Sequence, residues 1–138
     1  MKINLLLLSG LLLTACVGPE ELYDGLVDNI PTVTQTDKSF NYLVRAQNYT
    51  INDAYDLGFN YTSASLITTT LVVSGASARD SLHFTFLDDS SRVLLENTII
   101  GNLVFTSKDS IAFFAPREVR FNAQDYTGEF QCVLVLSE

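Results

Sequence analysis

The sequence predicts an all-β fold, a single antiparallel β-sandwich of about eight or nine short strands. From Ser39 onward, apolar and polar residues alternate with a period of two, as in strands that bury one face. Clusters of Gly, Ser, Asp and Asn separate these runs, and no segment carries a helical stripe of useful length. A small closed β-barrel is the alternative that the same pattern allows.

The strands are expected to follow one another with short turns between them. Two alternating runs come first, and a β-branched run, typical of a more buried strand, follows them. Asp88-Asp89-Ser90-Ser91 has the composition of a hairpin turn, and Pro116 ends a late strand. The expected strands are Phe40–Ala46, Tyr55–Tyr61, Leu66–Val73, Leu82–Phe86, Val93–Ile100, Leu103–Thr106, Ile111–Ala115, Val119–Phe121 and Phe130–Leu136, with an optional edge strand at Thr32–Thr36.

The N-terminus has the layout of a secretory signal. Lys2 precedes an apolar run from Ile3 to Leu13, which is shorter than the roughly 20 residues that a membrane-spanning helix needs. The run ends in Leu13-Thr14-Ala15-Cys16, with leucine three positions before the cysteine and a small residue directly before it. This stretch resembles the lipobox of bacterial lipoproteins. An uncleaved anchor helix and an ordinary signal that is cut after Ala15 are the alternatives.

The resemblance implies a lipid anchor. In bacterial lipoproteins the cysteine thiol is acylated and the signal is cut directly before it, so Cys16 would begin the processed chain. Two or three acyl chains hold a protein on a bilayer durably, whereas a single chain is marginal. For a Gram-negative cell, valine rather than aspartate at position 17, directly after the cysteine, resembles the sequence of lipoproteins that are sorted to the outer membrane. The resemblance therefore implies a place in the cell envelope, at the periplasmic face or the cell surface.

Composition and charge set the expected domain organisation and narrow the partners. We expect a signal peptide at 1–15, the lipidated cysteine with an acidic tether at 16–37, and the β-sandwich at 38–138. A formal net charge of −8 disfavours nucleic acid and anionic lipid headgroups as partners. Cys132 is the only other cysteine of the sequence, so an acylated Cys16 leaves no internal disulfide.

A partial resemblance to immunoglobulin domains lies near the C-terminus. Gly128 and Cys132 match the spacing before the second cysteine of those domains, with Phe130 in the place of the corner tyrosine. Asp125 stands one residue early, and the chain has no tryptophan. The resemblance implies an immunoglobulin-like strand order and no particular function.

Few residues of the sequence could carry chemistry. His83, the one histidine, falls on the polar face of an expected strand, and Cys132 falls in an apolar strand. Oxygen ligands for calcium occur in two loops, 52–56 and 88–90, where turn formation also explains them. The sequence contains no nucleophile elbow, zinc motif or phosphate-binding glycine loop. We therefore expect no catalytic residue, no metal site and no cofactor.

Four tyrosines fall close together in the sequence, at Tyr42, Tyr49, Tyr55 and Tyr61. Exposed together, they would form a patch for a protein or a sugar; otherwise they line the sandwich interior with their hydroxyls at its rim. The favoured function is a lipid-anchored, non-enzymatic component of the envelope that docks on another envelope protein. A module for glycans or peptidoglycan fragments is one alternative, and a small envelope hydrolase that uses His83 or a pair of acids is another.

Overall fold

The computed structural model describes residues 25–138, so the predicted signal peptide and Cys16 lie outside the described residues. Within this part of the chain every regular element is a β-strand, and no helix is long and apolar enough to cross a membrane. The predicted all-β class is confirmed. The strands are β1 (Thr32–Gln35), β2 (Ser39–Asp56), β3 (Leu66–Ser74), β4 (Ser81–Leu87), β5 (Val93–Ile100), β6 (Leu103–Ser110) and β7 (Glu118–Ser137).

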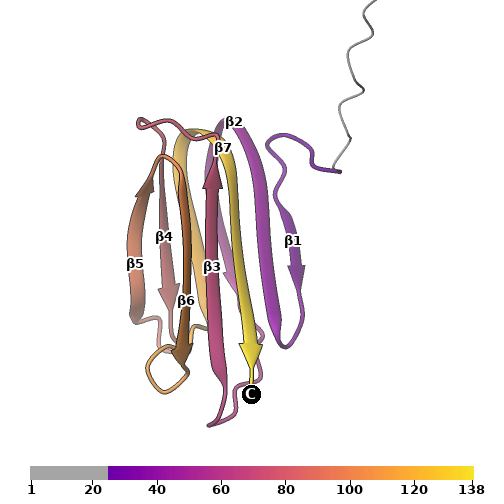
Figure 1. Ribbon diagram of the computed structural model, residues 1–138, viewed down its shortest axis with the longest axis vertical. Helices are drawn as coiled ribbons and strands as arrows, with labels where there is room; N and C mark the ends of the chain where they lie inside the picture. Colours follow the sequence, from indigo (N-terminus) through magenta and orange to yellow (C-terminus); the bar gives the residue numbers. More distant parts are fainter. Residues whose placement is uncertain (1–24) are drawn as a thin grey trace, which may run out of the picture.

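Two long strands, β2 and β7, run through both layers of the sandwich (Figure 1). They pair with each other along most of their length, and β7 pairs on its other side with β4 in its first half and with β3 in its second half. One layer is therefore ordered β1-β2-β7-β3-β6, and the other contains the remaining halves of β2 and β7 followed by β4 and β5. The fold is an antiparallel sandwich formed by one sheet that folds over on itself.

The fold-over occurs at a bend shared by β2 and β7, at the top of Figure 1. Asn48 and Asp125 take φ angles of 51° and 50°, a region that Asn and Asp enter more readily than other residues with side chains. The register of β2 against β7 shifts on both sides of Tyr49, and such bulges sharpen a bend. Gly128 has φ 141°, and a Cβ there would lie 3.0 Å from the Ser74 carbonyl oxygen. The bend therefore requires glycine at this position.

The core lies between the two layers and consists of the inward residues of the alternating pattern. β2, β3, β4 and β7 all alternate between buried and more exposed residues. The rings of Tyr42, Phe121 and Phe130 meet at its centre, with centroids 4.5, 5.1 and 5.8 Å apart. Each fully buried side chain of this size contributes about 1.5–3 kcal/mol of transfer free energy. Burial of the apolar side chains of this core is thus the main favourable contribution to stability.

The domain begins earlier than residue 38. Thr32–Gln35 is a strand paired with β2, as the optional edge strand predicts, and the Asn29 backbone N–H donates to the Arg45 carbonyl oxygen. The predicted tether at 16–37 is therefore too long at its C-terminal end. The interpretation as a spacer is wrong at Thr32–Gln35, because β1 is exposed along its whole length and so has no alternation of buried and exposed residues.

Four expected strands are also corrected. β2 ends at Asp56, and Leu57 and Phe59 are buried from a loop rather than from a strand over Tyr55–Tyr61. The segment expected as a strand at Ile111–Ala115 is not one, since the Phe113 and Phe114 N–H groups both donate to the Ser110 carbonyl oxygen in a tight turn. The two short strands expected at the C-terminus are one strand, β7, because pairing with β2 continues around the bend. The strands are therefore fewer and longer than predicted.

Neither the immunoglobulin-like order nor the closed barrel is found. Immunoglobulin domains divide seven strands between two separate sheets, whereas here β2 and β7 belong to both layers. A barrel would need β5 to pair with β6. Within the described residues β5 pairs with β4 alone and β6 with β3 alone, which leaves that side of the sandwich open.

Candidate functional site

The sandwich has two flanks, the long sides where an edge of one layer faces an edge of the other layer. On one flank β2 lies at the side of both layers, with β1 beyond it in one of them, and on the other flank the edges are β5 and β6 (Figure 1). We call these the β2 flank and the β5–β6 flank. They differ in what fills the space between the layers.

Side chains of the protein itself close the β2 flank. Tyr42 is fully buried in one layer, and its hydroxyl donates to Oδ2 of Asp53 at 2.7 Å, in the half of β2 that belongs to the other layer. The Tyr55 ring lies 5.7 Å from the Tyr42 ring, and Tyr49 also packs against the core. Burial, helped by the hydrogen bond and the negative charge of Asp53, raises the pKa of Tyr42 above its usual range. Aromatic rings and one carboxylate thus link the layers here.

Inward side chains leave the β5–β6 flank open. Pairing with β4 turns Leu95, Asn97 and Ile99 inward, opposite buried residues, and pairing with β3 does the same for Leu103 and Phe105. Although they point inward, Leu103 is 37% exposed and Phe105 is 40% exposed. A cleft of about 490 Å³ lies between the two rows. The two edge strands therefore face a gap that none of the described residues fills.

The cleft is apolar and uncharged. Leu71 and Phe84 are among the buried residues that line it, and none of the described residues in the lining is ionisable. From Asn97 to Thr106 the chain contains no Asp, Glu, Lys or Arg, although its formal net charge is −8. Val104 alternates with Leu103 and Phe105 on β6, so it faces away from the cleft, and it is 76% exposed. Contiguous exposed apolar surface of this kind marks interaction sites in soluble domains.

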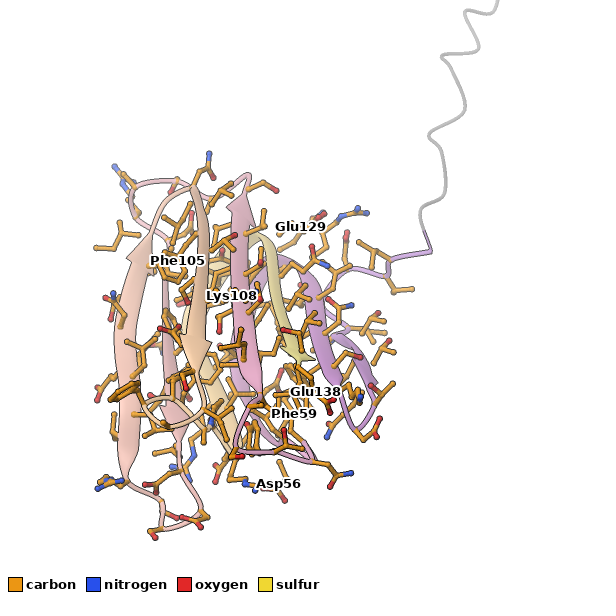
Figure 2. The ribbon with its side chains drawn as sticks, turned by 60° about the horizontal axis from the view of Figure 1, so that its bottom comes forward. Asp56, Phe59, Phe105, Lys108, Glu129 and Glu138 are labelled. Carbon is orange, nitrogen blue, oxygen red and sulfur yellow. The ribbon has the colours of Figure 1, made fainter. Side chains whose placement is uncertain are left out.

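None of the described strands pairs with the backbone edges of this flank either. Soluble proteins usually protect such edges with lysine, proline, bulges or inward-facing charges, because an unpaired edge recruits other strands. β6 carries these devices only in its second half, where Lys108 lies and where Asp109 pairs opposite Ile67. Figure 2 shows Phe105 and Lys108 along this strand. The first half of β6, 103–106, is an unprotected edge beside the apolar cleft.

The four predicted tyrosines do not share one exposed surface. Tyr42 belongs to the core with its hydroxyl toward the rim, which fits the interior alternative and removes it from any surface patch. Tyr49 and Tyr55 are half-buried beside it. Tyr61 is held elsewhere: its hydroxyl donates to the Pro116 carbonyl oxygen, and the Arg117 guanidinium carbon lies 4.6 Å from its ring centre. No stacking platform for a sugar results.

His83 and Cys132 occupy ordinary structural positions. His83 alternates with the buried residues of β4, with Nδ1 3.1 Å from the Thr98 hydroxyl and Nε2 3.3 Å from a carboxylate oxygen of Glu96. Cys132 is fully buried, and burial raises the pKa of its thiol above the usual range. A thiol that stays protonated is a poor nucleophile.

Each of the two candidate calcium loops has at least one carboxylate that is engaged within the protein. Asp88 accepts hydrogen bonds from the Ser90 and Arg92 backbone N–H groups and from the Arg92 guanidinium, and the Arg92 N–H bond leads the causes that lower its pKa. Asp53 accepts the hydroxyl of Tyr42. Among residues 25–138, no three His, Cys, Asp or Glu side chains are grouped as metal ligands.

The open flank was not among the sites expected from the sequence. Both β5 and β6 were expected as strands, but alternation does not reveal which strands end up at an edge. That outcome depends on β7 reaching β4 with one half and β3 with the other. The one available signal was the uncharged, β-prone run from Asn97 to Thr106 in an acidic chain.

Comparison with known proteins gives distant likenesses of fold. No protein-family model matches the chain, and no curated protein matches it. A chain of the structure described as "Bacillus endospore appendages form a novel family of disulfide-linked pili" has a TM-score of 0.42 and 8% identity, over 80% of this chain and 90% of that chain. A structure described as "BiXyn10A CBM1 APO" has a TM-score of 0.35 and 13% identity, over 82% and 86%. At these TM-scores neither carries a function to this chain.

Proposed function

We propose that this protein is a lipid-anchored component of the bacterial cell envelope whose β-sandwich binds another protein and catalyses no reaction. The proposed anchor is Cys16, on the strength of Leu13-Thr14-Ala15-Cys16. The proposed binding surface is the β5–β6 flank. These two parts of the proposal are independent, and each has its own test.

The observation that carries the binding function is the uncharged cleft between two strand edges that pair with nothing else in residues 25–138. A domain with a well-packed core on every other side has no structural need for such a surface, and exposure of it to water is unfavourable. The same cleft is a poor site for catalysis, because it offers no group that could transfer a proton. A protein partner gives the surface a use.

The anchoring half is tested by replacing the cysteine. Cys16→Ser removes the thiol that would be acylated, so we expect loss of radiolabelled palmitate incorporation and transfer of the protein from the membrane fraction to the soluble fraction. A membrane-bound, unlabelled Cys16→Ser variant would contradict the lipid anchor and favour an uncleaved helix.

The binding half is tested with a matched pair of variants. Leu103 and Val33 are both inward-facing residues of edge strands and both 37% exposed, but they lie on opposite flanks. After cross-linking in intact cells and affinity purification, we expect Leu103→Lys to lose a protein that the wild type and Val33→Lys both retain. Identical sets of captured proteins from the two variants would contradict binding through the β5–β6 flank.

A further inference from the structure

We propose that the β5–β6 flank binds by strand addition: an extended segment of a partner protein pairs with the edge of β6 at 103–106 and places uncharged, apolar side chains in the cleft. This inference rests on the proposed protein-binding function and specifies the form of the partner. Three properties of the flank select this occupant.

The first property is the unpaired backbone of the edges. Within the described chain β6 pairs with β3 alone, so its outer edge presents N–H and C=O groups beside the cleft. An acyl chain could cover Leu103 and Phe105 but would leave these groups without hydrogen bonds, and burying an unpaired polar group is unfavourable. A polypeptide strand covers the side chains and also pairs the backbone. The occupant is therefore a polypeptide.

The second property is the spacing of the inward residues. Leu95, Asn97 and Ile99 on β5, and Leu103 and Phe105 on β6, point inward at every second position. A strand advances about 3.3 Å per residue, so a segment of about six residues matches the length of this cleft wall. Figure 1 shows β5 and β6 running in opposite directions, and every pairing of the described strands is antiparallel. We therefore infer an added strand antiparallel to β6.

The third property is charge. A charged side chain placed in a cleft without an ionisable residue would lose its hydration and gain no counter-charge. A second copy of this chain would add its own net charge of −8 to an equally acidic neighbour. The chain's own residues 16–24 do not match either, because they include Pro19, Glu20, Glu21 and Asp24. A neutral or basic segment of a different protein fits best.

The test uses the processed chain, 16–138, as the isotope-labelled Cys16→Ser variant. The probe is a capped peptide in which a six-residue segment of alternating valine and threonine lies between terminal lysines. The control peptide has aspartate in place of each valine. At millimolar peptide we expect saturable binding of the probe alone, with at least tenfold slower amide exchange at 103–106 and no change in β1. Absence of this protection would overturn strand addition.

A second variant distinguishes insertion from apolar adhesion. Asn97 faces the cleft from β5, opposite the buried Phe84. Asn97→Phe makes the flank more apolar but fills the space that the added strand needs, so we expect at least tenfold weaker peptide binding. Stronger binding by Asn97→Phe would mean non-specific adhesion and would contradict the proposal. Val33→Lys is the control and should bind the peptide as the wild type does.

Two other occupants are separate outcomes of the same experiment. Saturable binding of dodecanoate in the cleft, without amide protection by the peptide, would assign the flank to an acyl chain and overturn the proposal. A concentration-dependent dimer that protects 103–106 without peptide would assign it to a second copy. If cellular capture depends on Leu103 but no peptide protects β6, strand addition fails while the protein-binding function stands.

Discussion

On the β2 flank the two layers are joined by Tyr42, which is buried in one layer and donates its hydroxyl to Asp53 in the other. On the β5–β6 flank the inward residues Leu103 and Phe105 stop short of the opposite layer and border a cleft. The same sheet therefore closes on one side with its own side chains and stays open on the other. The first flank contributes to stability through its own contacts, and the open second flank supports our proposal that it is the binding surface.

The strand edges differ in the same way. β1 has only four residues, and Pro31 and Asp37 flank it closely, so its edge is short and protected. β6 has eight residues and carries its charges only in the second half. An unprotected apolar edge is an aggregation hazard, and a natural protein tolerates it where a partner covers it.

The largest expected difference in stability is between two variants that each truncate one aromatic residue, one on each flank. Tyr42→Ala should lower the free energy of unfolding by about 3–5 kcal/mol, because it empties a fully buried site that contacts several rings. Phe105→Ala should cost about 1 kcal/mol or less, since much of its ring already contacts water. Urea unfolding measures both. Equal losses of unfolding free energy in the two variants would contradict the distinction between a closed β2 flank and an open β5–β6 flank.

The next effect concerns the bend that holds both layers. Gly128→Ala introduces a Cβ 3.0 Å from the Ser74 carbonyl oxygen at a strained φ, so we expect a loss of about 1–3 kcal/mol. Gly25→Ala is the control, because φ is +80° there but nothing lies within 4 Å of the added carbon. In thermal unfolding, the midpoint temperature of Gly128→Ala should be clearly lower than that of Gly25→Ala. A reversed order would contradict the close approach at the bend.

A smaller effect is expected from removing the hydroxyl that links the layers on the β2 flank. Tyr42→Phe keeps the ring but leaves Asp53 without that donor, so the free energy of unfolding should fall by about 1 kcal/mol. Asp53→Asn, which retains an oxygen acceptor, is the matched variant, and urea unfolding of both checks the estimate. No change in Tyr42→Phe would mean that the hydrogen bond does not link the layers.

Alkaline pH tests the same flank. Burial raises the pKa of Tyr42 above its usual range and that of Tyr126 to about 12. Because the unfolded phenols lose their protons near pH 10 while the folded ones keep theirs, stability is full below about pH 10 and falls as the pH rises toward 12. Urea unfolding at several pH values should show this fall, and it should be shallower in Tyr42→Phe. A fall that is equally steep in this variant would contradict a buried Tyr42.

The smallest effect on stability is expected on the outer face of the edge strand β6. Val104 is 76% exposed, so Val104→Lys should change the free energy of unfolding by no more than about 0.5 kcal/mol. The same variant should nevertheless weaken partner capture, because it places a charge on the proposed docking edge. Unchanged capture would narrow the binding surface to the cleft interior.

Alternation in the sequence predicted the buried faces well and the strand ends poorly. Phe130, Cys132 and Leu134 share one buried face as expected, because period two follows directly from strand geometry. The continuity of β7 was not predictable, since Asp125 and Gly128 look like turn residues and pairing with β2 keeps them within the strand. Leu57 and Phe59 are buried from a loop, but their spacing of two residues matches the alternation of a strand.

The candidate site was less predictable than the fold. A row of tyrosines is visible in the sequence, but whether Tyr42 faces solvent depends on which layer its half of β2 joins. The open flank arises from the absence of pairing between β5 and β6, and an absence of pairing leaves no local pattern. Only the uncharged run from Asn97 to Thr106 pointed there.

The most direct test of the central claim compares the two flanks in living cells. A photo-reactive phenylalanine analogue at position 105 samples the β5–β6 flank, and the same analogue at position 33 samples an equally exposed edge on the β2 flank. We predict that irradiation cross-links one recurring protein from position 105 and none from position 33. The same cross-links from both positions, or cross-links from position 33 alone, would contradict the account.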